Sequence, residues 1–129
     1  MARVGLVTVL VHDYDVGIEF FSRCLGFRLL EDTSLGDDKR WVVLAPPGDD
    51  STGILLARPG NEMQRAQVGR QAGGRVAFFL YSDDFEADHR HMTEAGVRFI
   101  EHPRHEPYGT VAVFEDCSGN QWDLIQLNP

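Results

Sequence analysis

The chain has 129 residues, a length that fits one domain or two very small modules. Its formal net charge of −8 argues against general nucleic-acid binding, which needs a basic surface, and gives no attraction to anionic membranes. No apolar run approaches the roughly 20 residues that span a bilayer. Two cysteines and no preceding signal peptide lead us to expect a cytoplasmic protein with reduced thiols.

The first half of the chain shows the pattern of one strand, one helix and three further strands. β-branched residues predict a strand over residues 4–11. Ile18, Phe21 and Leu25 recur at spacings of three and four, which marks the buried face of a helix, and Asp15 is a candidate N-cap for it. Strands are then expected at 27–31, 40–45 and 53–57, with a turn over 46–50.

A polar stretch at 58–74 separates this half from the second and is expected to be a connecting loop with a short helix around 63–68. The first pattern then returns. A helix is expected to start at 83–86, where an aspartate N-cap is followed three residues later by a glutamate. The strands of the second half are expected at 75–81, 97–101, 110–114 and 121–127.

The segments LGFRLLE at 25–31 and AGVRFIE at 95–101 have the same form and lie about 70 residues apart. Each has a helix end, a glycine, and an apolar strand with Arg and Glu at matching positions. The repeat predicts two strand–helix–strand–strand–strand modules, at 1–58 and 74–129. One module alone is too small to bury its sheet face, so the two are expected to pack into a single domain over 1–129.

Four motifs, in this order, make the chain similar to a known family. They are Val11-x-Asp13, Phe20-Phe21-x-x-x-Leu25-Gly26-Phe27, Ala95-Gly96-Val97, and Asp116-x-x-Gly119-Asn120 with an acidic residue at 123. On these residues the chain resembles the vicinal oxygen chelate superfamily, also called the glyoxalase/bleomycin-resistance/dioxygenase superfamily. The resemblance implies an α+β fold, in which two paired βαβββ modules form a U-shaped mixed sheet around a cavity, and a homodimer.

The resemblance also locates the family's metal site. Metal-dependent relatives use His, Gln or Glu in the first strand of each repeat and Glu in a last strand, which correspond here to Leu6, Arg75 and Asp123. Leu has no lone pair, Arg is cationic, and one carboxylate does not make a tight divalent site. We therefore expect no metal and no other cofactor, and we interpret Asp123 as the ion-pair partner of Arg75.

Strand alternation gives the side chains expected to line the cavity. The predicted ligand-binding residues are Thr8, Trp41, Arg75, Val111, Val113 and Asp123. This lining is mostly apolar with a few polar groups, as is typical of small-molecule sites. The alternative is that the apolar side chains fill a closed core.

Three of the five histidines bear on possible metal binding. His89 shares the apolar face of its helix and is interpreted as a packing residue. His102 and His105 lie in residues 101–107, whose two prolines favour a rigid loop near the mouth of the cavity. Ligand-rich loops are usually solvated, and whether these two histidines bind a metal stays open.

Three functions remain open because members of the superfamily are isomerases, dioxygenases, transferases and binding proteins, and a fold alone does not decide among them. The first hypothesis is a metal-free protein of the bleomycin-resistance kind that binds a small organic molecule. The second is a lyase, isomerase or dioxygenase, metal-dependent or with Asp123 as the base. The third is an interaction module whose cavity is filled. Metal retention would favour the enzyme, and ligand stabilisation without metal would favour the binder.

Overall fold

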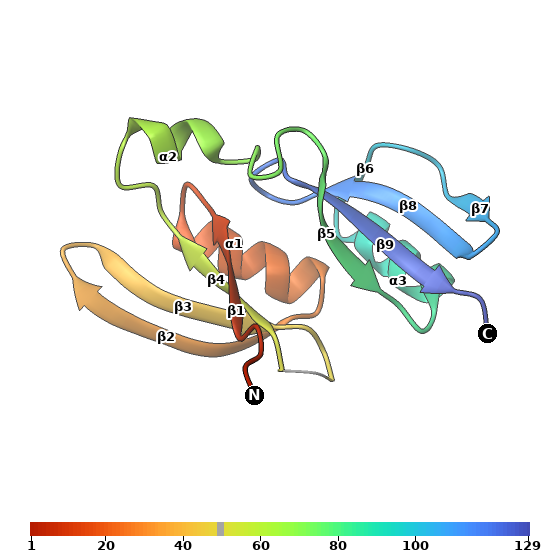
Figure 1. Cartoon of the computed structure of the whole chain (residues 1–129), viewed down its shortest axis with the longest axis horizontal. Helices are drawn as coiled ribbons and strands as arrows, with labels where there is room; N and C mark the ends of the chain where they lie inside the picture. The colour runs from red at the N-terminus through yellow and green to blue at the C-terminus, as the bar shows by residue number, and fades with distance from the viewer. Residues whose placement is uncertain (49–50) are drawn as a thin grey trace. The chain divides into compact units, whose positions relative to one another are not determined.

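The computed structural model describes residues 1–48 and 51–129, so Asp49 and Asp50 of the turn expected over 46–50 lie outside the described residues. The chain divides into two compact units, Met1–Val68 and Gly69–Pro129, which we call unit 1 and unit 2 (Figure 1). Across the two described ranges, no helix is both long enough and apolar enough to cross a membrane.

Unit 1 contains a mixed sheet with the strand order β1-β4-β3-β2. Its strands are β1 (Leu6–Leu10), β2 (Arg28–Gly36), β3 (Lys39–Ala45) and β4 (Gly53–Ala57). β1 runs parallel to β4, and the other neighbours are antiparallel. β2 continues beyond the expected 27–31 because it forms a long hairpin with β3.

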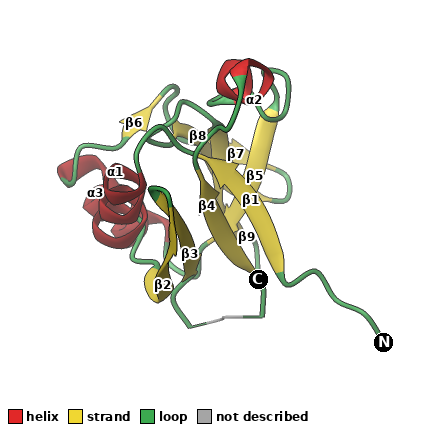
Figure 2. Cartoon of the chain, turned by 90° about the vertical axis from the view of Figure 1, so that its left-hand side faces the viewer, coloured by secondary structure: helices red, strands yellow, loops and turns green. Residues whose placement is uncertain are grey.

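One face of this sheet is covered by the helical segment between β1 and β2 (Figure 2). It consists of α1 (Tyr14–Glu19) followed by a π-helical stretch, η1 (Phe20–Cys24). Gly17 allows close packing, because a Cβ atom there would lie 2.8 Å from Leu56 Cδ1 and 3.2 Å from Val11 Cγ1. Phe21 is fully buried in the resulting core.

The N-cap of α1 is Asp13, so the expectation of Asp15 is wrong. The Asp13 side chain accepts a hydrogen bond from the Val16 backbone N–H at 3.0 Å. Asp15 lies in the first helical turn and forms an ion pair with Arg40. Both aspartates precede the apolar helical face and both suit an N-cap, so spacing alone does not distinguish them. The short helix expected around 63–68 is α2 (Glu62–Gln67).

Unit 2 contains a second mixed sheet with the order β5-β9-β8-β6, and β7 also pairs with β8. Its elements are β5 (Val76–Tyr81), α3 (Phe85–Glu94), β6 (Arg98–Phe99), β7 (Arg104–Glu106), β8 (Gly109–Glu115) and β9 (Gln121–Leu127). The expectation that 101–107 is a loop is therefore wrong for β7. The backbone of this segment pairs with β8, a long-range contact that local composition does not indicate.

The repeat is visible in the strand register. Arg28 pairs with Ala45 in unit 1, and Arg98 pairs with Glu115 in unit 2, so both partners move by the same offset of 70 (98 − 28 and 115 − 45). A glycine with positive φ precedes each of these strands, with φ of 71° at Gly26 and 95° at Gly96. An α+β fold of two repeated βαβββ modules is thus confirmed, with β7 as an additional strand in the second.

An aromatic cluster joins α3 to one face of the unit 2 sheet. His89 of α3 lies 4.3 Å from the ring of Phe99 between ring centroids, and Phe99 in turn contacts Phe114 at 5.6 Å. Phe114 stacks against Trp122 on the neighbouring strand. His89 is half-buried within this cluster, which confirms it as a packing residue. The opposite face of the sheet carries no helix of unit 2.

The motif Asp116-x-x-Gly119-Asn120 builds the turn that starts β9. The buried Asp116 carboxylate accepts hydrogen bonds from the backbone N–H groups of Ser118 and Asn120 at 2.9 and 3.0 Å. It also accepts from Trp122 Nε1 at 2.9 Å. These contacts hold the turn and the first residues of β9 together, and so fix the register of β9.

Candidate functional site

The helix-free face of unit 2 is the face of its sheet opposite α3. Strand register places on it Phe79, Tyr81, Val111, Val113, Asp123 and Ile125. Asp123 lies in one row between Phe79 of β5 and Val113 of β8. Ile125 lies in the next row, between Tyr81 and Val111. The structure therefore brings together three residues predicted from the sequence: Val111, Val113 and Asp123.

Asp123 is the polar group in this apolar surface. Its Oδ1 atom is buried and has no hydrogen-bond partner among the described residues. Burial raises the pKa of Asp123 above its ordinary value, because the charged carboxylate loses solvent. The positive charge of Arg104 opposes this rise in pKa, and the negative charge of Glu101 adds to it.

Arg104 is the cation of this region, and two glutamates hold it. Its Nε atom lies 3.0 Å from Glu101 Oε1, and its Nη1 atom lies 2.8 Å from Glu106 Oε1. The same Glu101 oxygen accepts the backbone N–H of Val113 at 3.1 Å. The sequence analysis missed the cluster of Arg104, Glu101 and Glu106, because it considered residues 101–107 only as possible metal ligands. The alternation of acidic and basic residues within that segment was the available signal.

The expected ion pair between Arg75 and Asp123 is not found among the described residues. Arg75 precedes β5, is exposed, and its backbone N–H bonds the carbonyl of Ala72 at 3.2 Å. The residue beside Asp123 is Phe79, and a register shift between Val76 and Phe78 separates the start of β5 from this row. Arg75 lies four residues (79 − 75) before Phe79 and outside β5, so it cannot reach the row of Asp123 with or without this irregularity.

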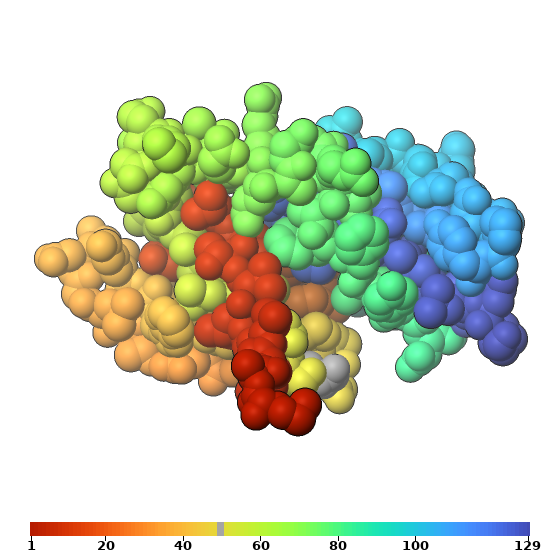
Figure 3. Space-filling view, viewed as in Figure 1, coloured from red at the N-terminus to blue at the C-terminus, as the bar shows by residue number. Residues whose placement is uncertain are grey.

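In unit 1, the face opposite α1 carries Thr8, Leu55 and Val43 in one row. Trp41, two residues before Val43, is 37% exposed and lines a pocket of about 370 Å³ with Leu55 and Arg58. Figure 3 shows the N-terminal residues, drawn in red, at the surface of the molecule. Thr8 and Trp41 thus belong to the face on which strand alternation predicted them.

Arg40 beside Trp41 is not available for an anionic ligand. Its Nε and Nη2 atoms bind the two Asp32 oxygens at 3.0 and 2.7 Å, and Nη1 binds Asp15 at 2.9 Å. Its guanidinium also lies over the Tyr14 ring, 5.3 Å from the centroid. Arg40 therefore links β3 to Asp32 of β2 and to Asp15 of α1, and it has a structural role.

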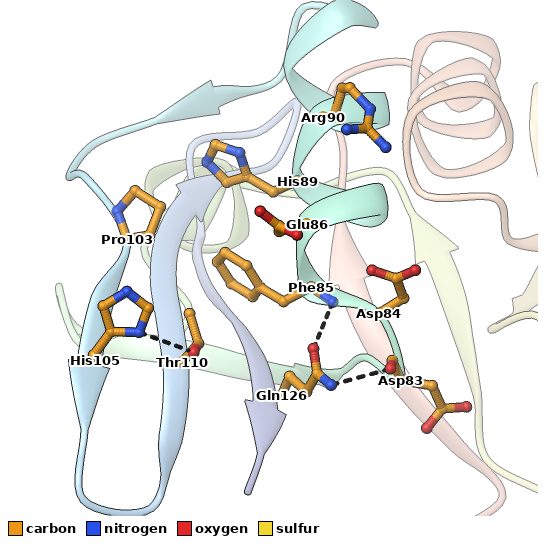
Figure 4. A pocket seen from close by; sticks show the side chains of 10 residues that line it. All are labelled: Asp83, Asp84, Phe85, Glu86, His89, Arg90, Pro103, His105, Thr110 and Gln126. Carbon is orange, nitrogen blue, oxygen red and sulfur yellow. Dashed lines mark hydrogen bonds between the residues drawn. The ribbon is translucent and has the colours of Figure 1, made fainter.

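In unit 2, a pocket of about 670 Å³ lies beside α3 (Figure 4). The amide of Gln126 faces it but is used by the helix start, accepting the N–H of Phe85 at 2.7 Å and donating to the carbonyl of Asp83 at 3.1 Å. His105 Nδ1 lies 3.2 Å from Thr110 Oγ1, and Thr110 is the cross-strand neighbour of Gln126. Much of the polar lining of this pocket thus serves the structure of unit 2.

Residues 3–124 match the model of the Glyoxalase/Bleomycin resistance protein/Dioxygenase superfamily. The chain belongs to this family. An uncharacterized protein of Shewanella frigidimarina is 49% identical, over 95% of this chain and 91% of the relative. The chain is therefore a family member over nearly its whole length.

Two solved structures of this superfamily fold are similar in sequence as well. TnmS3, an antibiotic-binding protein from Streptomyces sp. CB03234, is 30% identical, with a TM-score of 0.80 over 99% of this chain and 98% of that chain. A superfamily member from Sphaerobacter thermophilus DSM 20745 is also 30% identical, with a TM-score of 0.81 over 98% of each chain. These likenesses confirm the fold class and the family.

The residues of the chain do not fit the divalent metal that the family implies. Leu6 offers only hydrocarbon, and Arg75 lies outside β5. The neighbours of Asp123 in its row are Phe79 and Val113. The positive charge of Arg104 acts on Asp123 and would repel a metal cation there. Within residues 1–48 and 51–129, no three His, Cys, Asp or Glu side chains gather as a metal site would require.

Proposed function

We propose that this family member binds a small organic molecule without the family's catalytic metal. The main support comes from the helix-free face of unit 2. There Asp123 Oδ1, which is buried and has no hydrogen-bond partner among the described residues, lies among apolar side chains. Val111, Val113 and Ile125 of this face are buried, whereas Phe79 and Tyr81 are exposed, so the two rings supply its accessible apolar area. An apolar surface with one or two polar groups is the usual composition of a small-molecule site.

Each predicted ligand contact has a place in this proposal. Val111, Val113 and Asp123 belong to the helix-free face of unit 2. Thr8 and Trp41 stay predicted ligand contacts on the face of unit 1 opposite α1. Arg75 stays a predicted ligand contact, now independent of Asp123. The modules 1–58 and 74–129 are proposed to act as one domain over 1–129, in a cytoplasmic homodimer.

Antibiotic binding by TnmS3 supports a binding role within this family. A lyase or isomerase is the second candidate, since a half-buried carboxylate whose pKa is raised by burial suits a general base. The two candidates differ in what Asp123 must do. A binder needs only its hydrogen-bonding capacity, whereas an enzyme loses turnover when the carboxylate becomes an amide.

The test is a titration of methyl-labelled protein with naphthylmethanol, a small apolar probe with one hydroxyl group, in the presence of a chelator. The proposal predicts saturable chemical-shift changes at the methyl groups of Val111, Val113 and Ile125. A matched control is Ala87 of α3, which should not shift. Absence of saturable changes, or changes confined to the pocket beside α3, would contradict the proposal.

A further inference from the structure

The buried oxygen of Asp123 needs a hydrogen-bond donor that the described residues do not supply. A carboxylate acceptor that is buried and unpaired costs free energy, so native structures rarely keep one without a reason. Here the atom is Oδ1, which has no partner in the described chain. Its cross-strand neighbours, Phe79 and Val113, have no side-chain donors.

Two nearby donor groups, the Arg104 guanidinium and the Val113 N–H, are directed at glutamates. Arg104 directs Nε at Glu101 and Nη1 at Glu106, at 3.0 and 2.8 Å. The backbone N–H of Val113 donates to Glu101. The cation that influences Asp123 is thus held by two other carboxylates, and it makes no hydrogen bond to Asp123 Oδ1 among the described residues.

The charge of this region favours one kind of ligand. Asp123, Glu101 and Glu106 carry three negative charges when ionised, against the single positive charge of Arg104. An anionic ligand group would be repelled there, whereas a hydroxyl or ammonium group would find an acceptor. Phe79 and Tyr81 are 57% and 64% exposed on the same face, and they offer aromatic surface to a ring.

We propose that the ligand of this face has an apolar, ring-bearing body that ends in a hydrogen-bond donor, a hydroxyl or an ammonium group, which donates to Asp123 Oδ1. This inference rests on the proposed function and adds the chemical class of the ligand. The exposed rings of Phe79 and Tyr81 contact its body, and the buried side chains of Val111, Val113 and Ile125 belong to the same face. Ligands with a carboxylate at the same place are excluded.

Four matched probes test this inference by NMR titration: naphthylmethylamine, naphthylmethanol, the methyl ether of that alcohol, and naphthoate. All four have the same ring system, and only the first two have a donor. The inference predicts that the amine and the alcohol bind at least about tenfold more tightly than the methyl ether, and that naphthoate binds weakest. The comparison of amine with alcohol decides whether the donor is charged or neutral.

Two variants provide the controls. Asp123→Asn keeps the size of the side chain but removes the charge, and it should reduce the affinity for the amine about tenfold while leaving that for the methyl ether unchanged. Glu94→Gln removes one exposed charge from α3 and should change neither affinity. Asp123→Leu, an apolar replacement of similar volume, should abolish the preference for donors.

The outcomes separate this inference from the proposed function. If the methyl ether binds wild-type protein as tightly as the alcohol and the amine, the donor inference is overturned, while small-molecule binding stands. Equal loss of amine affinity in Asp123→Asn and Glu94→Gln would also overturn it, because the effect would then be one of net charge. If none of the four probes shifts the methyl groups of Val111 and Val113, the proposed function itself fails.

Discussion

Glu101 Oε1 lies 3.0 Å from Arg104 Nε, and the same oxygen accepts the backbone N–H of Val113 from the neighbouring strand. A side chain thus completes the hydrogen bonding of β8 where the partner strand is interrupted between β6 and β7. This arrangement supports the surface around Asp123. The contributions of the ion pair to Arg104 and of the hydrogen bond from Val113 can therefore be measured separately by mutation.

Glu101→Ala should destabilise the protein by about 1–3 kcal/mol, because the half-buried Val113 N–H loses its acceptor as well as the ion pair. Glu106→Ala is the matched control, since it removes an ion pair to the same arginine and no backbone bond. It should cost less than about 1 kcal/mol, as half-exposed ion pairs do. Urea unfolding measures both, and equal losses would contradict the role of the Val113 bond.

Asp116→Ala should be among the most destabilising changes in unit 2, at about 2–4 kcal/mol, because it leaves the donors of Ser118, Asn120 and Trp122 without their buried acceptor. Cys117→Ala, at an exposed position of the same turn, should change the free energy of unfolding by less than about 0.5 kcal/mol. Chemical denaturation tests the pair, and a small effect of Asp116→Ala would refute the account of the turn.

The two cysteines should differ strongly in reactivity. Cys24 is buried, and burial raises the pKa of its thiol, so little reactive thiolate forms near pH 8. Cys117 is exposed. Native protein should therefore release one equivalent of chromophore rapidly from a disulfide reagent, and the second only after unfolding. Rapid reaction of both thiols in native protein, or a native signal that survives Cys117→Ser, would contradict this arrangement.

Asp32 should contribute to the loss of stability in acid. Hydrogen bonds from Arg40 lower the pKa of its carboxyl in the folded protein. Its stabilising contribution is therefore complete above the unfolded value of about 4, and is lost as the pH falls through the lower folded value. The stability difference between wild type and Asp32→Asn should be constant near neutrality and should shrink below pH about 4. A difference that grows in acid would contradict the pairing.

The repeat was the most informative feature of the sequence, because matching glycines and apolar strands determine local structure whatever the distant contacts are. Gly26 and Gly96 both adopt positive φ as helix ends commonly require. The same local reasoning placed Val111, Val113 and Asp123 on one face, since alternation along a strand has a fixed period.

The parts that sequence reasoning missed depend on pairing between distant segments. The partner assigned to Asp123 was wrong because Arg75 lies before β5, four residues (79 − 75) ahead of Phe79, which pairs with Asp123. Arg104 was overlooked because β7 becomes a strand only through its pairing with β8. Neither feature has a local signature, so both required the structure.

Metal retention tests the central claim most directly. Untagged protein would be incubated with nickel, zinc, manganese and iron in turn, desalted, and measured by elemental analysis beside Asp123→Ala. A metal-free binding protein should retain far less than one equivalent, with no difference between the two proteins. Near-stoichiometric retention in wild type that disappears in Asp123→Ala would contradict the account and identify a metal-dependent enzyme with unusual ligands.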